Sequence, residues 1–155
     1  MATTYNNTQI AIIDSSGNIN VIYPRTKTVF LAGTIDNGNS TNWQEELIDM
    51  CKNKDIVFFN PRRKDRLGEL SKEELEYQIK WEQAHLDQAD IIIMCLLDNS
   101  TSPISLLELG LYAQSGKLLV FCNKAFYRYD NIRLTCQKYN IPLYPYDLSL
   151  IKDIL

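Results

Sequence analysis

Five runs of apolar residues recur along the chain, separated by segments in which apolar and polar residues follow a helical period. Each run has apolar side chains at both odd and even positions, which is typical of parallel strands buried on both faces. The predicted strands are Thr28–Ala32, Ile56–Phe59, Asp90–Leu97, Leu118–Cys122 and Ile141–Tyr144. Because Pro142 interrupts the last run, we expect that strand at an edge of the sheet.

The segments between the strands carry helix signals. The predicted helices begin at Trp43, run from Ser71 to about Gln88, run from Pro103 to Gly116, and cover Asn131–Tyr139. Asn42 is a suitable N-cap for the first helix. Ser71 and Glu74 form a capping box that starts the second, and Pro103 fits the first turn of the third.

This alternation of strands and helices predicts an α/β fold, with a five-stranded parallel sheet covered by helices on both faces. Upstream of it, Thr8–Ile13 and Ile19–Tyr23 are β-rich runs on either side of a turn cluster at residues 14–18. They predict an N-terminal β-hairpin. We therefore expect a single domain over residues 1–155, with the hairpin at 8–23 and the α/β core at 28–144.

Charge and hydropathy exclude several classes of partner. The 155 residues carry a formal net charge of −3 at pH 7, whereas a protein that binds a nucleic-acid polymer normally has a basic excess. No apolar run approaches the roughly 18 residues of a transmembrane helix. The N-terminus lacks the basic and apolar regions of a secretory signal. We expect a cytoplasmic protein that binds neither a nucleic-acid polymer nor a membrane.

Cysteine and histidine usage argues against a metal site. The four cysteines, Cys51, Cys95, Cys122 and Cys136, contain no C-x-x-C pair and are interpreted as buried thiols in a reducing compartment. His85 is the only histidine. One histidine without paired cysteines nearly excludes zinc, so we predict no metal and no cofactor.

In doubly wound folds, ligands bind beyond the carboxyl ends of the parallel strands. This rule selects four loops, which cover residues 33–40, 60–70, 98–102 and 123–130. Candidate functional residues are therefore sought in these loops and on the helices that begin beside them.

Glu108 is the only charged residue between Asn99 and Gly116. The helix that carries it has no polar face at any rotation, so we expect it to be buried nearly all round, with Glu108 inside. Glutamate is almost never fully buried unless it is paired. Glu108 is therefore either a structural acid held by a buried arginine or by amides, or a functional acid that faces the cleft at the strand ends.

Glu82 lies in the middle of an apolar helix face formed with Leu75, Ile79 and Leu86. Two carboxyls on apolar faces of neighbouring helices suit acid–base or nucleophilic work at a sugar carbon. The alternative is an acid at the helix rim that reaches solvent. A second stripe, with Tyr77, Trp81 and His85, is typical of a helix flank packed on another element.

Arg62 and Arg63 follow the end of a predicted strand. Guanidinium groups suit a phosphate or carboxylate ligand, and a solvated loop is the alternative interpretation.

Several motifs together resemble the nucleoside 2-deoxyribosyltransferase-like family. They are Val29–Asp36 (VFLAGTID), Asn60–Arg63 (NPRR), Trp81-Glu82 ahead of Asp90, Ser102–Ala113 (SPISLLELGLYA) and Asp130-Asn131. The resemblance runs from about Thr28 to Leu143, and its Glu-Leu-Gly-x-x-Ala block is fairly specific. It implies a flavodoxin-like doubly wound sheet and chemistry at the N-glycosidic bond of a nucleoside or nucleotide.

The resemblance also implies roles for individual residues. Glu108 takes the position of the nucleophile that attacks C1′ of the sugar, and Glu82 that of an acid that helps protonate the leaving base. Asn131 takes the position of a residue that reaches into a neighbouring subunit's site, which implies a homo-oligomer, dimeric or larger. The residues expected to contact substrate are Gly33, Thr34, Asp36, Asn60, Arg62, Arg63, Trp81, Ser102, Ser105 and Asn131.

The chain departs from the family pattern at three positions. Phe30 stands where transferases have a tyrosine, Ser102 near a second aspartate, and Glu82 where an aspartate is usual. Together with Arg62 and Arg63, these departures keep a nucleotide or NAD-type N-glycohydrolase open beside a deoxyribosyltransferase. A protein that binds nucleotides without turning them over is the third alternative.

Overall fold

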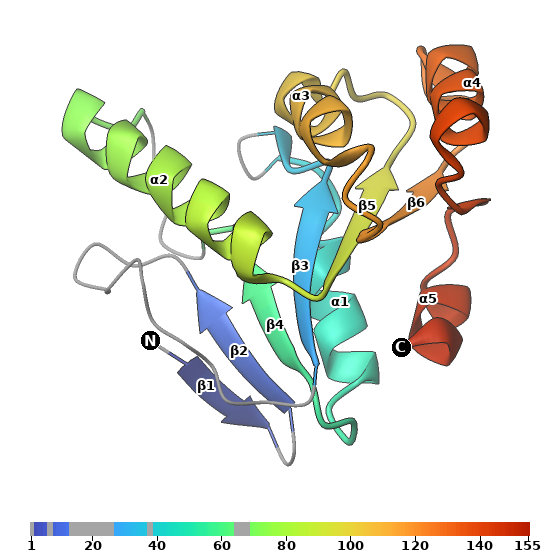
Figure 1. Ribbon diagram of the computed structural model, residues 1–155. Coiled ribbons are helices and arrows are strands. Elements are labelled where there is room, and N and C mark those ends of the chain that lie inside the picture. The colour runs from blue at the N-terminus through green and yellow to red at the C-terminus, as the bar shows by residue number, and fades with distance from the viewer. Residues whose placement is uncertain (1, 6–7, 13–26, 37–38, 64–68) are drawn as a thin grey trace.

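The computed structural model describes residues 2–5, 8–12, 27–36, 39–63 and 69–155. Its strands form one sheet in the order β1-β2-β4-β3-β5-β6-β7 (Figure 1). The strands are β1 (Ala2–Tyr5), β2 (Thr8–Ile12), β3 (Thr28–Gly33), β4 (Val57–Asn60), β5 (Ile91–Leu96), β6 (Leu118–Cys122) and β7 (Leu143–Tyr144). All five strands predicted from the apolar runs are present.

The five strands from β3 to β7 are parallel to their neighbours. Their order in the sheet places the second strand first, then the first, third, fourth and fifth, which is the flavodoxin-like arrangement. β7, the strand that contains the residues after Pro142, lies at the edge as predicted. The fold class expected from the sequence is confirmed.

The N-terminal hairpin extends the sheet beyond β4. β1 and β2 pair antiparallel, and β2 pairs parallel with β4 from Gln9 opposite Val57 to Ile12 opposite Asn60. The run Thr8–Ile13 is thus a strand as expected, but its hairpin partner in the described residues is β1, which the sequence did not predict. The expected partner, Ile19–Tyr23, and the turn at 14–18 lie outside the described residues.

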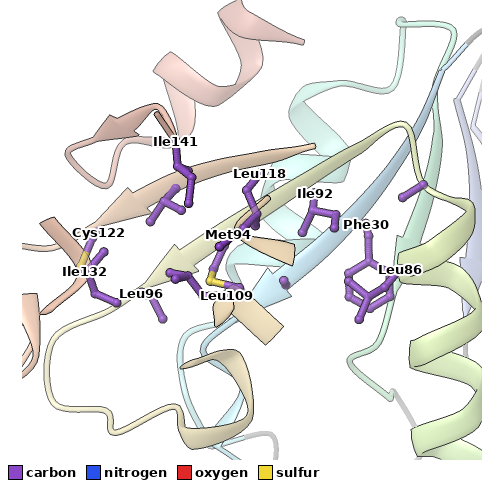
Figure 2. Close-up of a cluster of buried hydrophobic side chains, with 14 of the residues drawn as sticks. Phe30, Leu86, Ile92, Met94, Leu96, Leu109, Leu118, Cys122, Ile132 and Ile141 are labelled. Atoms are coloured by element: carbon purple, nitrogen blue, oxygen red, sulfur yellow. The ribbon is translucent and has the colours of Figure 1, made fainter. Parts of the chain in front are cut away.

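The helices cover both faces of the sheet (Figure 1). They are α1 (Trp43–Met50), α2 (Lys72–Gln88), α3 (Pro103–Tyr112), α4 (Tyr129–Tyr139) and α5 (Leu148–Ile154). Alternate residues of β3 enter two separate cores. Phe30 and Ala32 pack with side chains of α2, α3 and α4, whereas Val29 and Leu31 pack with α1 and α5. Figure 2 shows the first of these cores, which contains Phe30, Leu86, Met94 and Leu109.

Two helices differ from expectation. α5 was not predicted, because its short run of apolar residues lacks a clear period; Asp147 caps it by accepting from the backbone of Ser149 and Leu150. α3 was expected to be buried nearly all round, and this is wrong. Ile104, Leu107 and Leu111 are 58%, 57% and 65% exposed, because α3 lies on only one face of the sheet and nothing in the described chain covers its outer side.

Two other sequence expectations concern the whole chain. All four cysteines are buried thiols, with none in a disulfide. Among the described residues, no helix combines the length and the apolar character that a membrane crossing requires.

Candidate active site

A pocket of about 670 Å³ opens at the carboxyl end of β3 and β4, between α2 and α3. It is lined by Ala32, Gly33, Ile35, Asp36, Pro61, Arg62, Arg63, Leu75, Gln78, Ile79, Glu82, Thr101, Ser102, Pro103, Ile104, Ser105 and Glu108. Three of the four loops selected from the strand ends contribute to this wall. The fourth, residues 123–130, does not.

Gly33 ends β3 at the floor of the pocket. Its φ of +122° is a conformation that side chains disfavour, and a Cβ placed there would collide with the backbone of Cys95 on β5. Glycine is therefore required here by the close approach of the neighbouring strand.

Glu82 on α2 and Glu108 on α3 line this pocket together. Burial raises the pKa of Glu82 to about 7, and a hydrogen bond from Gln78 opposes this rise. Burial, reinforced by the negative charge of Glu82, raises the pKa of Glu108 to about 8. The two carboxyls are electrostatically coupled, so near neutral pH the pair retains a proton that two exposed glutamates would have lost.

Glu108 could instead have been a structural acid. No hydrogen bond or ion pair to its side chain is found among the described residues, so neither a buried arginine nor an amide holds it there. The geometry favours the functional interpretation.

Gln78 lies one helical turn before Glu82 on α2 and also lines the pocket. Its Nε2 donates to Oε1 of Glu82 over 3.1 Å. This bond fixes the position of the Glu82 carboxyl at the pocket wall.

A chain of hydroxyl groups crosses the base of the pocket. The Leu97 N–H donates to Thr34 Oγ1 (3.0 Å), which lies 2.8 Å from Ser102 Oγ. Ser102 Oγ lies 2.7 Å from Ser100 Oγ, which donates to Asp36 Oδ1 over 2.7 Å. Each hydroxyl has one proton, so the donation by Ser100 to Asp36 obliges Ser102 to donate to Ser100, and Thr34 to Ser102. Toward the pocket, Ser102 can only accept.

Two members of this chain, Asp36 (φ 52°) and Ser102 (φ 44°), have left-handed backbones, and so does Asn99 (φ 58°), which precedes Ser100. Such conformations cost roughly 1–2 kcal/mol each for residues other than glycine and persist where tertiary contacts impose them. Here the hydroxyl chain supplies those contacts, and it holds Asp36 at the rim of the pocket.

Arg62 lines the pocket, but its guanidinium group is engaged elsewhere. Nη1 donates to Thr41 O (2.9 Å), Ser40 Oγ (3.3 Å) and Gln44 Oε1 (3.3 Å), and Nη2 donates to Ser40 O (2.6 Å). These bonds anchor the segment that precedes α1. The guanidinium therefore serves the loop structure, which the sequence did not reveal.

Four residues expected to contact substrate do not line the pocket. Thr34 lies beneath it in the hydroxyl chain, and Asn60 accepts from the Arg62 N–H in the turn after β4. Trp81 is buried in the core, stacked on His85 with ring centroids 3.9 Å apart, as a packed helix flank would be. Asn131 is exposed on the first turn of α4.

Sequence reasoning missed Gln78 and Ser100. The position of Gln78, one turn before Glu82 on the same helix face, was a usable signal. Ser100 had none, since its place depends on the left-handed turns at Asn99 and Ser102.

Comparisons with known proteins agree with this architecture. Among the solved structures, the 2-deoxyribosyltransferase of the psychrotolerant bacterium Bacillus psychrosaccharolyticus is similar, with a TM-score of 0.62 and 17% identity, over 81% of this chain and 90% of that one. At that identity, the likeness shows the fold. No curated protein matches. A family model described as "Nucleoside 2-deoxyribosyltransferase like" matches residues 26–126, which include β3, the NPRR turn, both pocket carboxyls and the hydroxyl chain. On this match over most of its length, the chain belongs to the nucleoside 2-deoxyribosyltransferase-like family.

Proposed function

We propose that this protein is an enzyme that cleaves the N-glycosidic bond of a (deoxy)nucleoside and transfers the sugar to a second base. The observation that carries the proposal is the pair of coupled carboxyls, Glu82 and Glu108, which face one pocket from two helices. Membership of the family supports the reaction class.

In the proposed reaction, an ionised Glu108 oxygen attacks C1′ of the sugar and forms an ester bond to it. The bond between C1′ and the base nitrogen breaks, and its electron pair stays with the base, which takes a proton from Glu82. The carboxylate stabilises the oxocarbenium character of the transition state. A nitrogen of the second base then attacks C1′, gives its proton to Glu82 and frees Glu108. Water in place of the second base would release the free sugar.

A nucleophile must be ionised while its partner acid is protonated, and the coupled pair holds one proton between about pH 7 and 8. In the free site that proton lies mainly on Glu108, which has the higher pKa, so the proposed reaction requires the proton to move to Glu82 before Glu108 attacks. Two exposed glutamates would both be ionised at that pH.

The pocket favours an uncharged nucleoside over a 5′-nucleotide. Arg62 was a candidate for a phosphate, but its donors bind Ser40, Thr41 and Gln44. The remaining charged side chains that line the pocket are three acids, Asp36, Glu82 and Glu108, and one cation, Arg63. Because the acids outnumber the cation, the lining is better suited to sugar hydroxyls, which donate hydrogen bonds, than to a phosphate.

Incubation with a 2′-deoxynucleoside and a different free base, and separately with deoxynucleotides in water, tests the proposal. A swapped nucleoside supports transfer, whereas free base and sugar support an N-glycohydrolase. Thermal stabilisation by nucleosides without turnover supports a binding protein instead. Glu108→Ala should abolish turnover while the circular dichroism spectrum stays unchanged. Glu76→Ala, at an exposed position on α2 away from the pocket, is the matched control.

We also propose that the chain self-associates through α3. Ile104, Leu107 and Leu111 form an exposed apolar stripe along α3, and Ile104 also lines the pocket. A second copy that packs against this stripe would remove its apolar side chains from water. Asn131 lies away from the pocket of its own chain, so the contact to substrate implied by the resemblance could come only from a second copy.

A further inference from the structure

The side-chain amide of Gln78 is only half satisfied. Nε2 donates to Glu82 Oε1, but Oε1 of Gln78 is buried and has no hydrogen-bond partner among the described residues. Buried acceptors in native proteins almost always have a partner, so each exception needs an explanation. Because Gln78 lines the pocket, a ligand that turns this side chain slightly can reach the buried oxygen and supply the missing donor.

The orientation of the amide follows from its neighbour. The oxygen and nitrogen of a glutamine amide are assigned from the hydrogen-bond network. An ionised Glu82 only accepts, so Nε2 must face it. When Glu82 is protonated, the proposed reaction commits its hydroxyl proton to the leaving base, so Nε2 still faces Glu82 Oε1 and Gln78 Oε1 keeps no partner within the described protein. The same bond leaves the proton of the acid on Glu82 Oε2.

The surroundings of Gln78 fit an aromatic ring better than a sugar. Leu75 and Ile79 flank it on α2 and line the same wall of the pocket. A flat ring can lie against these apolar side chains, whereas a sugar presents hydroxyl groups on several sides. In the proposed reaction the base lies at Glu82, and the 3.1 Å bond from Glu82 to Gln78 puts the amide next to that base.

Together, Glu82 and Gln78 present an acid proton beside an acceptor. A purine with an amino group at position 6 has the complementary edge, with the N7 acceptor next to the N6 donor. A 6-oxopurine has acceptors at both N7 and O6, so its oxygen would face the Gln78 oxygen. We propose that Gln78 is a specificity-determining residue that selects 6-aminopurines as the leaving base. This inference rests on the proposed function.

The test compares 2′-deoxyadenosine with 2′-deoxyinosine, which differ in the group at position 6. The kcat/KM for base release is measured for the wild type, for Gln78→Leu and Gln78→Met, and for the control Gln83→Leu, which changes an exposed residue of the same helix. We expect the wild type and the control to favour 2′-deoxyadenosine by about tenfold or more, and both Gln78 variants to fall within about threefold. Loss of support to Glu82 would lower both rates alike and leave their ratio unchanged.

The outcomes separate this inference from the proposed function. Turnover with a ratio that both Gln78 variants retain, or a wild type that favours 2′-deoxyinosine, overturns the role of Gln78 and leaves the reaction standing. A wild type that turns over no nucleoside overturns both. Circular dichroism shows whether each variant is folded, and the ratio from either folded Gln78 variant decides the question.

Discussion

Glu108 shows at the scale of one residue how burial prepares a carboxyl for chemistry. Its neighbours in α3 are apolar, it faces the pocket, and no cation among the described residues offsets the loss of hydration. Burial and the charge of Glu82 together raise the pKa of Glu108 to about 8. A side chain held in this way destabilises the folded protein when it is ionised, which a site for chemistry tolerates and a purely structural acid would not.

The raised pKa of Glu108 makes stability depend on pH. An acid whose pKa is higher in the folded state than its ordinary value of 4.5 binds its proton more tightly when folded, so the unfolding free energy falls as the pH rises from about 4.5 to 8. Glu108→Gln removes this loss. We expect the variant to melt at the same temperature as the wild type near pH 4, and several degrees higher at pH 8.5. Melting temperatures measured between pH 4 and 8.5 check this prediction, with Glu76→Gln as the exposed control. If the melting temperatures of Glu108→Gln and of the wild type changed in parallel with pH, the prediction would be wrong.

Ser100 tests the hydroxyl chain. Ser100→Ala removes the donor to Asp36 and the acceptor for Ser102, so a buried hydroxyl loses its partner. We expect the unfolding free energy to fall by about 1–3 kcal/mol in urea titrations. The exposed Ser149→Ala should change it little. If Ser100→Ala were as stable as Ser149→Ala, the hydroxyl chain would contribute nothing measurable to the free energy of unfolding.

Individual residues were predictable to different degrees. Glu82 and Glu108 could be placed at the strand-end cleft because each is an acid in an apolar helical stripe, and helical spacing is a local property. Arg62 could not be placed, because its partners are distant in the chain: Ser40 and Thr41 lie in the loop before α1 and Gln44 in its first turn. Trp81 and Asn60 could not be placed for the same reason. Each makes contacts within the protein beside the pocket, and residue type alone does not reveal those contacts.

At the scale of elements, α2 and α3 form the site by the faces they turn inward. α2 begins at the capping box of Ser71 and Glu74, and its inner stripe passes from the core at Leu86 to the pocket at Glu82. α3 begins at Pro103, directly after the left-handed Ser102, so Glu108 enters the pocket in the second turn. These starts were predictable from capping residues. β1 and α5 were not, because short elements are stabilised by their neighbours more than by their own pattern.

The exposed stripe of α3 leads to a prediction about assembly. Leu107→Glu places a charge at the centre of this stripe, where it would be buried without a partner in a dimer. We expect the wild type to sediment as a dimer or larger species at micromolar concentration and Leu107→Glu as a monomer. Ser149→Glu, on α5 at the opposite face of the sheet, should sediment like the wild type. A monomeric wild type, or a Leu107→Glu variant that still associates, would refute self-association through α3.

At the scale of the whole molecule, the sheet brings together residues that are far apart in the chain. Gly33 ends β3, Pro61 follows β4, and Ser102 follows β5, so the carboxyl ends of three strands surround one pocket. The parallel sheet was predictable from the apolar runs, and its flavodoxin-like arrangement was implied by the family resemblance. The pocket itself was not, since its shape depends on the left-handed turns and on the outward position of α3.

The coupled carboxyls predict how activity changes with pH. Below about pH 7 both acids hold protons, so the nucleophile is lost, and above about pH 8 both are ionised, so the leaving base finds no acid. We expect kcat/KM for a 2′-deoxynucleoside to follow a bell with its maximum between these values. Glu82→Gln removes the acid that titrates on the alkaline side, so the remaining activity should rise with pH as Glu108 ionises and show no alkaline limb. A profile that is flat from pH 5 to 9 would show that this pair does not govern the reaction.

The central claim is that the Glu108 carboxylate forms a bond to the sugar. Mixing the enzyme with 2′-deoxyadenosine in the absence of an acceptor base, quenching with acid and measuring the intact mass tests it most directly, followed by mapping of the modified peptide. The account predicts a gain of one deoxyribosyl group on Glu108 in the wild type and in Glu76→Ala, and none in Glu108→Ala. A sugar found on another residue, or on Glu108→Ala, would contradict it.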